Sequence, residues 1–486
     1  MAEVASPTGE PPDTSNRESL ETGSRDLPVS SEVEAFIRQG WADSEPVEVC
    51  ALAPPARCSK RRASLSRLVP GDRVVVPSGR AAKRGNGQDI RFRPASDHVY
   101  LSGQAAAGAV LVLEPDGSEH RATLYLDPPT SRDQREFFSD AARGELWVGA
   151  WPSLEAVEEA LGMPCRPFGE LEANLSPGVT TRVLRGLDEA VDSLVAVDDS
   201  FPDLELRALL SELRLVKDEW EVRQIETAIV ATHAGFEDVV RELPGALGPG
   251  GERRIESVFL RRARMDGNDA GFDPIVAAGS HATTLHWTRN YGDLIAGELL
   301  LLDAGVESHT LYAADLTRTF PLSGSFSEVQ RRALDLLNDA HEAALAAIAP
   351  GRSFRDFHHA AAEVVSAGLA DWGVLPAAGR SPQSGLYRRF TICGTGHMLG
   401  LDVHDCAHAR ARTYLDGELR AGHVLTVEPG LYFQRDDLTF PEELRGTGVR
   451  VEDDVVVTET GVRVLSDRLA RRPADVEIRM ARLHSE

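Results

Sequence analysis

Short apolar segments alternate with helix-like stretches over residues 31–212. The segments at 73–76 and 109–113 have the length and β-branched content of buried strands, whereas residues 153–161 have the spacing of a helix. Strands in alternation with helices are typical of an α/β unit. We therefore expect residues 31–212 to form an α/β domain.

Longer helices are predicted in the C-terminal half. Apolar residues from Ile225 to Val239 recur at intervals of four and three residues, which predicts one face of a long helix. Two further helices are predicted from the capping-box spacing of Ser325 and Glu328 and from Ser353, each ahead of an apolar helical pattern. Strand-like segments lie between and after these helices, so this half reads as α+β.

The domain organisation follows from these patterns and from the two ends of the chain. Residues 213–470 are assigned to a second domain, and residues 471–486 to a C-terminal tail. Residues 1–30 contain six acids and almost no large apolar residue. Such a segment buries too little surface to offset the entropy lost on ordering, so we expect a disordered acidic tail.

Charge and composition exclude several classes of function. The formal net charge of -24 disfavours nucleic acid and anionic membrane surfaces as partners. Only three residues are lysines, and none has the context of a phosphate-binding loop or a Schiff-base enzyme. Five cysteines without a Cys-x-x-Cys spacing disfavour a disulfide scaffold or a thiolate zinc site. Without a visible signal peptide or membrane-spanning run, we expect a cytoplasmic protein.

Four acids in the C-terminal half directly follow strand-like apolar sequence. They are Asp303, Asp315, Glu428 and Glu452. A carboxylate inside a sheet is costly unless it is paired or binds a metal. Any one acid could simply end its strand in water, but four on neighbouring strands would repel one another without cations. Together with His397, which lies in a glycine-rich segment, they favour a metal site.

Other motif interpretations of the histidines are weaker. The glycine-rich segment has one residue too many for the dinucleotide-binding fingerprint. His404 and His408 have the spacing of ligands on one face of a helix, but the nearby glycines argue against a helix. His341 and Glu342 begin the zinc-protease helix motif, yet Leu345 occupies the place of its second histidine.

Five motifs follow one another in the C-terminal half: Leu302–Gly305, Ala314–Arg318, Gly396–Asp405, Val427–Gly430 and Gly448–Asp453. In this order they resemble the motifs of the pita-bread dinuclear metallopeptidases, and among them those of the aminopeptidase P (Xaa-Pro aminopeptidase) family. The resemblance extends from about residue 213 to 465, and the preceding α/β unit is similar in size and position to the creatinase-type domain of that family. It implies a creatinase-like α/β domain followed by an α+β pita-bread catalytic domain.

The resemblance also implies a set of metal ligands. Asp315 and Glu452 would bridge two ions, Asp303 would bind one ion, and His397 with Glu428 would bind the other. Such an oxygen-rich set with a single imidazole and no thiolate suits hard divalent ions, so Mn²⁺ is favoured over Zn²⁺ or Co²⁺. Two such ions share a water, lower its pKa and present hydroxide to the scissile carbonyl.

Further roles are implied for residues near these ligands. Glu428 would carry the proton from water toward the leaving nitrogen, and His404 would donate to the oxyanion. His286 matches the other substrate-facing histidine of the family. Arg450 alternates onto the same strand face as Glu452 and is expected to pair with a ligand acid or with substrate. Cys393 departs from the family, which commonly has histidine there, and is expected to be a buried, oxidation-sensitive thiol.

Other acids and histidines in the motif segments have no assigned role. Asp402 and His423 are expected to be solvated or structural, and Asp453 and Asp454 to be charges at a strand end.

The resemblance implies an exopeptidase that removes the N-terminal residue from peptides with proline in second position. A prolidase-type dipeptidase is the nearest alternative. A methionine aminopeptidase would leave the N-terminal domain surplus, and a non-catalytic peptide-binding relative would lack several of the five ligands. The N-terminal domain further implies a homo-oligomer, either a dimer or a tetramer.

Overall fold

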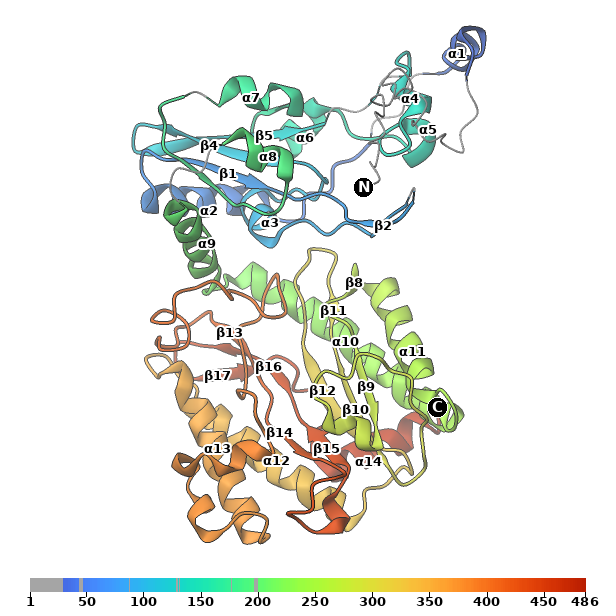
Figure 1. Ribbon diagram of the computed structural model, residues 1–486, viewed down its shortest axis with the longest axis vertical. Helices are drawn as coiled ribbons and strands as arrows, with labels where there is room; N and C mark the ends of the chain where they lie inside the picture. The colour runs from blue at the N-terminus through green and yellow to red at the C-terminus, as the bar shows by residue number, and fades with distance from the viewer. Residues whose placement is uncertain are drawn as a thin grey trace, which may run out of the picture. The chain divides into compact units, whose positions relative to one another are not determined.

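The computed structural model describes residues 29–42, 47–86, 88–127, 130, 132–175, 177–195 and 200–486 (Figure 1). The acidic tail predicted over residues 1–30 lies outside the described residues except for its last two. The chain divides into two compact units, one of residues 1–49 with 128–156 and the other of residues 50–127 with 157–486.

The described residues of the smaller unit form short helices. These are α1 (Ser31–Ile37), α4 (Glu136–Ser139) and α5 (Glu145–Val148). Helix α1 begins after Ser30, whose side chain accepts a hydrogen bond from the Val33 amide at 3.3 Å. Trp41 packs edge-on against Phe137, with ring centroids 5.3 Å apart.

The N-terminal part of the larger unit is built on a five-stranded sheet with strand order β6-β5-β4-β1-β7. Its strands are β1 (Arg73–Pro77), β4 (Val110–Asp116), β5 (Glu119–Leu126), β6 (Cys165–Pro167) and β7 (Thr181–Val183). Its helices are α2 (Pro55–Leu68), α3 (Ser96–Ser102), α6 (Leu154–Leu161), α7 (Leu171–Asn174), α8 (Glu189–Leu194) and α9 (Phe201–Arg214), and a small hairpin joins β2 (Lys83–Gly85) to β3 (Gln88–Asp89).

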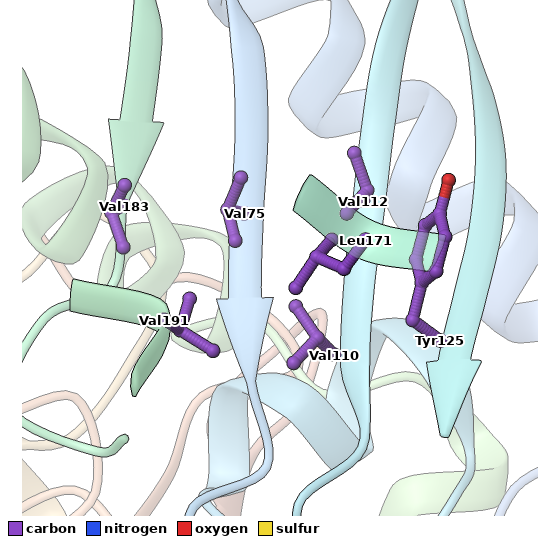
Figure 2. Close-up of a cluster of buried hydrophobic side chains, with 7 residues drawn as sticks. All are labelled: Val75, Val110, Val112, Tyr125, Leu171, Val183 and Val191. Atoms are coloured by element: carbon purple, nitrogen blue, oxygen red, sulfur yellow. The ribbon is translucent and has the colours of Figure 1, made fainter. Parts of the chain in front are cut away.

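The sheet is mixed, with β1 antiparallel to β4 and parallel to β7. Leu171 of α7 and Val191 of α8 pack onto one face of it, against Val75, Val112 and Val183 (Figure 2). Each of these five side chains has at most 1% of its surface exposed, so the alternation of strand and helix predicted from the sequence produces a closed apolar layer.

The C-terminal part of the larger unit carries the longer helices. They are α10 (Glu219–Ala246), α11 (Gly251–Asp266), α12 (Glu328–Ala347), α13 (Phe354–Asp371) and α14 (Pro473–Leu483). Its strands are β8 (Asp269–Ala270), β9 (Ile275–Ala278), β10 (Leu299–Ala304), β11 (Val306–Glu307), β12 (Leu316–Pro321), β13 (Val424–Val427), β14 (Gly430–Phe433), β15 (Thr447–Arg450), β16 (Asp453–Val457) and β17 (Val462–Val464).

The predicted helix starts are correct for α13 and wrong for α12. Ser353 caps α13 as expected. The capping box of α12 is formed by Ser327 and Gln330, two residues beyond the predicted pair. Two similarly spaced serines precede this helix, and the reciprocal hydrogen bonds of Ser327 and Gln330 mark the second as its cap.

Three strand groups bring the acidic motifs to one place. Strand β10 pairs with β9 and β12, β13 pairs with β16, and β14 pairs with β15. In the β10–β12 register Asp303 lies opposite Thr317, and an isolated bridge joins Thr317 to Glu452. The acids of separate motifs therefore lie on adjacent strands.

The last residues of the chain, assigned above to a tail, contain α14. Val476, Met480 and Leu483 of this helix are buried, and His484 Nε2 lies 2.8 Å from the Val240 carbonyl oxygen of α10. None of the helices in the described part of the chain has the length and apolar content needed to span a bilayer.

Candidate active site

A cavity of about 560 Å³ lies in the C-terminal part of the larger unit. All eight residues that the sequence assigned to a site line it: His286, Asp303, Asp315, His397, His404, Glu428, Arg450 and Glu452. Phe272, Ile275, Leu285 and Tyr432 contribute further walls. Motifs that span more than 160 residues of sequence therefore share one enclosure.

Strand ends position the acids in this cavity. Asp303 lies within β10, Asp315 immediately precedes β12, and Glu428 immediately follows β13. Glu452 lies between β15 and β16. His397 is held beside β13, because its carbonyl oxygen accepts a hydrogen bond from the Thr426 amide at 2.9 Å.

We call Asp303, Asp315, His397, Glu428 and Glu452 the ligand cluster. One potential ligand atom from each of Asp315, His397 and Glu452 lies within 4.8 Å of the others. His397 Nε2 lies 3.3 Å from Asp315 Oδ2 and 3.4 Å from Glu428 Oε1. The His397 imidazole therefore contacts carboxylates from two different strand segments.

Three acids of the ligand cluster have raised pKa values. Burial, reinforced by the charge of Asp303, raises the pKa of Asp315 to about 7. Burial and neighbouring carboxylates also raise the pKa of Glu428, and that of Glu452 lies well above its usual value. For His397 burial would lower the pKa, but Asp315 and Glu428 raise it to about 9. The protein alone supplies too little positive charge for this set of acids.

The ligand cluster fits divalent metal ions. Oδ1 of Asp303 is buried and has no hydrogen-bond partner within the part of the chain that the structure describes. A buried carboxylate oxygen without a donor is costly, and a cation would compensate it. Carboxylates with a single imidazole and no thiolate suit hard divalent ions.

Comparison with known proteins agrees with this geometry. The family described as metallopeptidase family M24 matches residues 223–459, and the N-terminal domain of aminopeptidase P matches residues 58–182. Xaa-Pro aminopeptidase 1 of Streptomyces coelicolor is 48% identical over 460 residues, which is 94% of this chain and 93% of that relative. The chain belongs to the aminopeptidase P family of metallopeptidases.

Solved structures of the family have the same fold. Aminopeptidase PepP of Pseudomonas aeruginosa superposes with a TM-score of 0.79 at 28% identity, over 90% of this chain and all of that one. Aminopeptidase P of E. coli with the inhibitor Pro-Leu gives 0.78 at 26% identity, also over 90% of this chain and all of that one. The predicted α/β N-terminal domain and pita-bread catalytic domain are confirmed, and the protein is a metal-dependent peptidase.

Arg450 pairs with a ligand acid, as its position on the strand predicted. Its guanidinium donates to Asp303 Oδ2, to the Tyr432 hydroxyl at 2.7 Å and to Thr317 Oγ1 at 3.1 Å. The Thr317 hydroxyl in turn donates to Glu452 Oε2 at 2.6 Å. Thr317 and Tyr432 were not singled out from the sequence, because only the strand register shows that they touch the acids.

The two predicted substrate-facing histidines lie on the exposed side of the cavity. The His404 ring meets the His397 ring edge-on, with centroids 4.4 Å apart. Burial and the nearby His397 lower the pKa of His404. Asp405 anchors the segment after His404, since its buried carboxylate pairs with Arg214 at 3.0 Å and with Lys217 at 2.8 Å.

Asp453 and Asp454 lie at the start of β16, a strand end as the sequence suggested, but they do not face solvent. Both are fully buried, and β16 pairs on two sides with β13 and β17. Asp453 contacts Arg318 at 2.7 Å, His341 at 3.2 Å and Arg471 at 3.4 Å, and we call these four residues the ion-pair cluster. Asp454 Oδ2 accepts a hydrogen bond from the Asp315 amide at 3.1 Å.

Cys393 is exposed, so the prediction of a buried thiol is wrong. It lines the cavity together with Thr391 and Gly394, in a loop with little cover over it. Of the two unassigned residues, His423 is buried, and Asp402 accepts hydrogen bonds from Ser96 at 2.6 Å and from Arg214 at 3.1 Å. Of the two roles expected for Asp402 and His423, solvated or structural, these contacts and this burial indicate the structural one.

Proposed function

We propose that this protein is an Xaa-Pro aminopeptidase, which hydrolyses the first peptide bond of peptides with proline in second position. One observation carries the proposal: the five residues of the ligand cluster share a single cavity with His286 and His404. The names of its relatives, Xaa-Pro aminopeptidases in Streptomyces coelicolor and in E. coli, support the same substrate class.

In this proposal the ligand cluster holds two divalent ions, with Mn²⁺ as the preferred metal. Asp315 and Glu452 would contact both ions, Asp303 would contact one, and His397 and Glu428 would contact the other. When bound, such ions polarise the scissile carbonyl and lower the pKa of water. The oxygen-rich donor set supports this preference for Mn²⁺.

The remaining chemistry is assigned to side chains. Glu428 accepts a proton from the attacking water and delivers it to the leaving nitrogen, for which its partly exposed place in the cavity is suited. His404 donates a hydrogen bond to the oxyanion of the tetrahedral intermediate. His286, which lines the same cavity, contacts the substrate.

A substrate with proline in second position brings two groups that the site must recognise, the proline ring and the free α-ammonium of the first residue. The bond to proline is a tertiary amide without an N–H group, so recognition must depend on shape. The apolar walls formed by Phe272, Ile275, Leu285 and Tyr432 can accept a pyrrolidine ring. The free α-ammonium of the first residue would pair with the acids of the ligand cluster.

The test compares an Xaa-Pro dipeptide with an Xaa-Pro-Xaa-Xaa tetrapeptide, using chelated and Mn²⁺-loaded protein and mass analysis of the products. Mn²⁺-dependent loss of one residue from the tetrapeptide is expected. Cleavage of the dipeptide alone would make the protein a prolidase. If two metal equivalents bind and neither peptide is cut, the proline specificity is wrong.

The organisation of the chain is part of the proposal. We assign residues 31–212 to the creatinase-like domain and 213–470 to the catalytic domain, flanked by an acidic tail over 1–30 and a C-terminal segment over 471–486. The protein is proposed to act in the cytoplasm as a dimer or tetramer on peptides, without nucleic acid or membrane partners. Light scattering of the full chain tests the oligomeric state.

A further inference from the structure

One wall of the cavity is a loop anchored on a buried carboxylate that does not reach the cavity itself. Leu285, His286 and Thr288 line the cavity. Glu252, in the first turn of α11, has none of its surface exposed and is absent from the lining. Glu252 is not among the residues singled out from the sequence, because no motif marks it and only the folded chain shows its partners.

Glu252 gathers four hydrogen-bond donors from this loop. Its Oε1 accepts from the Ala278 amide at 2.8 Å and lies 2.8 Å from His281 Nδ1. Its Oε2 accepts from the indole N–H of Trp287 at 2.9 Å and from the Gly292 amide at 2.6 Å. Because an ionised carboxylate can only accept, His281 carries its proton on Nδ1.

Ring packing locks the same loop. His281 stacks on Trp287 with ring centroids 3.8 Å apart, and Trp287 contacts Tyr291 at 5.0 Å. At Gly292 an added Cβ would come within 2.7 Å of Glu252 and 2.6 Å of His281, so the backbone approaches as closely as it can. Trp287 is buried and directly follows His286 in the chain, so holding Trp287 in place constrains the backbone at His286.

We propose that Glu252 is a positioning residue for the peptidase reaction, which acts by holding residues 278–292 so that His286 faces the substrate. The inference rests on the proposed function, because it takes the substrate contact of His286 as given. A carboxylate is suited to the task, since one side chain satisfies two backbone amides and two ring donors in a buried place. Displacing a substrate-contacting group by about 1 Å can cost about 100-fold in rate.

Two substitutions test the inference without touching the cavity. Glu252→Gln keeps the shape of the side chain but turns an amide N–H₂ toward donors, and Trp287→Phe keeps an aromatic ring but removes the pyrrole part of the indole with its N–H donor. Glu242→Gln is the matched control, because Glu242 of α10 pairs on the surface with Arg254 of α11, the helix that carries Glu252. We expect kcat/KM for the tetrapeptide to fall about 10- to 100-fold in the first two variants, and by less than about twofold in the control.

The decisive measurement is a double-mutant cycle with His286→Ala. If Glu252 acts through His286, Trp287→Phe and Glu252→Gln lose most of their effect on kcat/KM in the His286→Ala background. An equal loss in both backgrounds would overturn the inference. Since removing a buried carboxylate can prevent folding, the cycle with Trp287→Phe alone is sufficient to decide it.

A readout independent of activity separates this inference from the proposed function. The NMR signal of the His286 imidazole is identified by its loss in His286→Ala and is expected to shift in Trp287→Phe, while bound metal stays at the wild-type amount. An unshifted signal would overturn the positioning role. Failure of the wild-type protein to cut any Xaa-Pro peptide would instead overturn the proposed function, and the NMR result would still decide the role of Glu252.

Discussion

Glu452 and Asp453 are consecutive residues, both buried, in opposite electrostatic surroundings. Glu452, 1% exposed, belongs to the ligand cluster, where burial and three other carboxylates raise its pKa well above the usual value. Asp453, fully buried, belongs to the ion-pair cluster, where the charge of Arg318 and the contact with His341 outweigh burial and hold its pKa far below the usual range. Burial alone therefore does not identify a metal ligand.

The difference lies in how much positive charge the protein supplies. Asp453 has two guanidinium groups, one imidazole and the Ser466 hydroxyl within 3.4 Å. The four acids of the ligand cluster share His397 and one guanidinium, that of Arg450. The ion-pair cluster is compensated by the protein's own charges, whereas the ligand cluster is not, and this imbalance is the physical argument for the proposed metal site.

The largest effect is expected from removing the metal or a ligand that would contact both ions. Chelation, or Asp315→Asn, should lower kcat/KM more than about 100-fold. Loss of a residue that only hydrogen-bonds to a metal ligand costs at most about 100-fold, so a larger loss indicates a ligand itself. Peptide cleavage and bound-metal analysis would measure this. Asp436→Asn, on an exposed loop, is the control and should retain both. Full activity of Asp315→Asn would remove Asp315 from the ligand cluster.

The second prediction exchanges neighbouring acids for amides in the metal-free protein. Asp453→Asn should lower the free energy of unfolding by about 3–5 kcal/mol, because Arg318 keeps a buried charge without its partner. Glu452→Gln should leave it unchanged or raise it by up to about 1 kcal/mol, because one of four mutually repelling acids is removed and the Thr317 hydroxyl still finds an acceptor.

Urea unfolding of the chelated variants measures both values in one experiment. The comparison depends on the opposite responses of adjacent positions. If Glu452→Gln destabilises the metal-free protein as much as Asp453→Asn does, the ligand cluster is already compensated by the protein, and the charge argument for a metal fails.

A third prediction concerns a residue that belongs to neither cluster. His404→Ala should lower kcat about 100- to 1000-fold through loss of an oxyanion donor, with KM nearly unchanged. Metal content and stability should both remain at wild-type values, because His404 lies on the exposed side of the cavity. Loss of metal in this variant would show that His404 supports the ligand cluster instead of the transition state.

Much of the site could be predicted from the sequence because its chemistry is local. Asp303, Glu428 and Glu452 each follow strand-like sequence, so the possible cost of burying the acid is visible within one segment, and the recurrence of this pattern favours a metal site. The α/β alternation and the long helices are visible for the same reason, since period and capping act over a few residues.

What the sequence could not reveal depends on contacts between distant segments. Asp453 was taken for a strand-end charge because its partner Arg318 is 135 residues away and comes from a different sheet. His341 was considered only as part of a zinc motif, although it packs against Asp453. Glu252 lies on an amphipathic helix, and the sequence of that helix does not show that this acid is buried against a loop.

The smallest effect is expected at Thr317, which touches both clusters. Its hydroxyl donates to Glu452, while its carbonyl oxygen accepts from Arg318 at 2.9 Å. Thr317→Val removes only the hydroxyl and should weaken metal affinity about 10- to 100-fold, the usual cost of losing an outer partner of a ligand. Competition with a fluorescent chelator measures this, and Thr317→Ser should restore most of the affinity.

Thr319→Val is the matched control for this change. Thr319 is buried on the same strand, but its hydroxyl bonds the backbone of Arg450 and contacts no ligand side chain. The metal affinity of Thr319→Val should stay within about twofold of wild type. Losing its hydrogen bonds to the Arg450 backbone should lower the stability of the fold and leave the ligand side chains in place. If Thr317→Val also binds metal like wild type, the Thr317 hydroxyl does not orient Glu452. The contact of Thr317 with both clusters would then have no effect on metal binding.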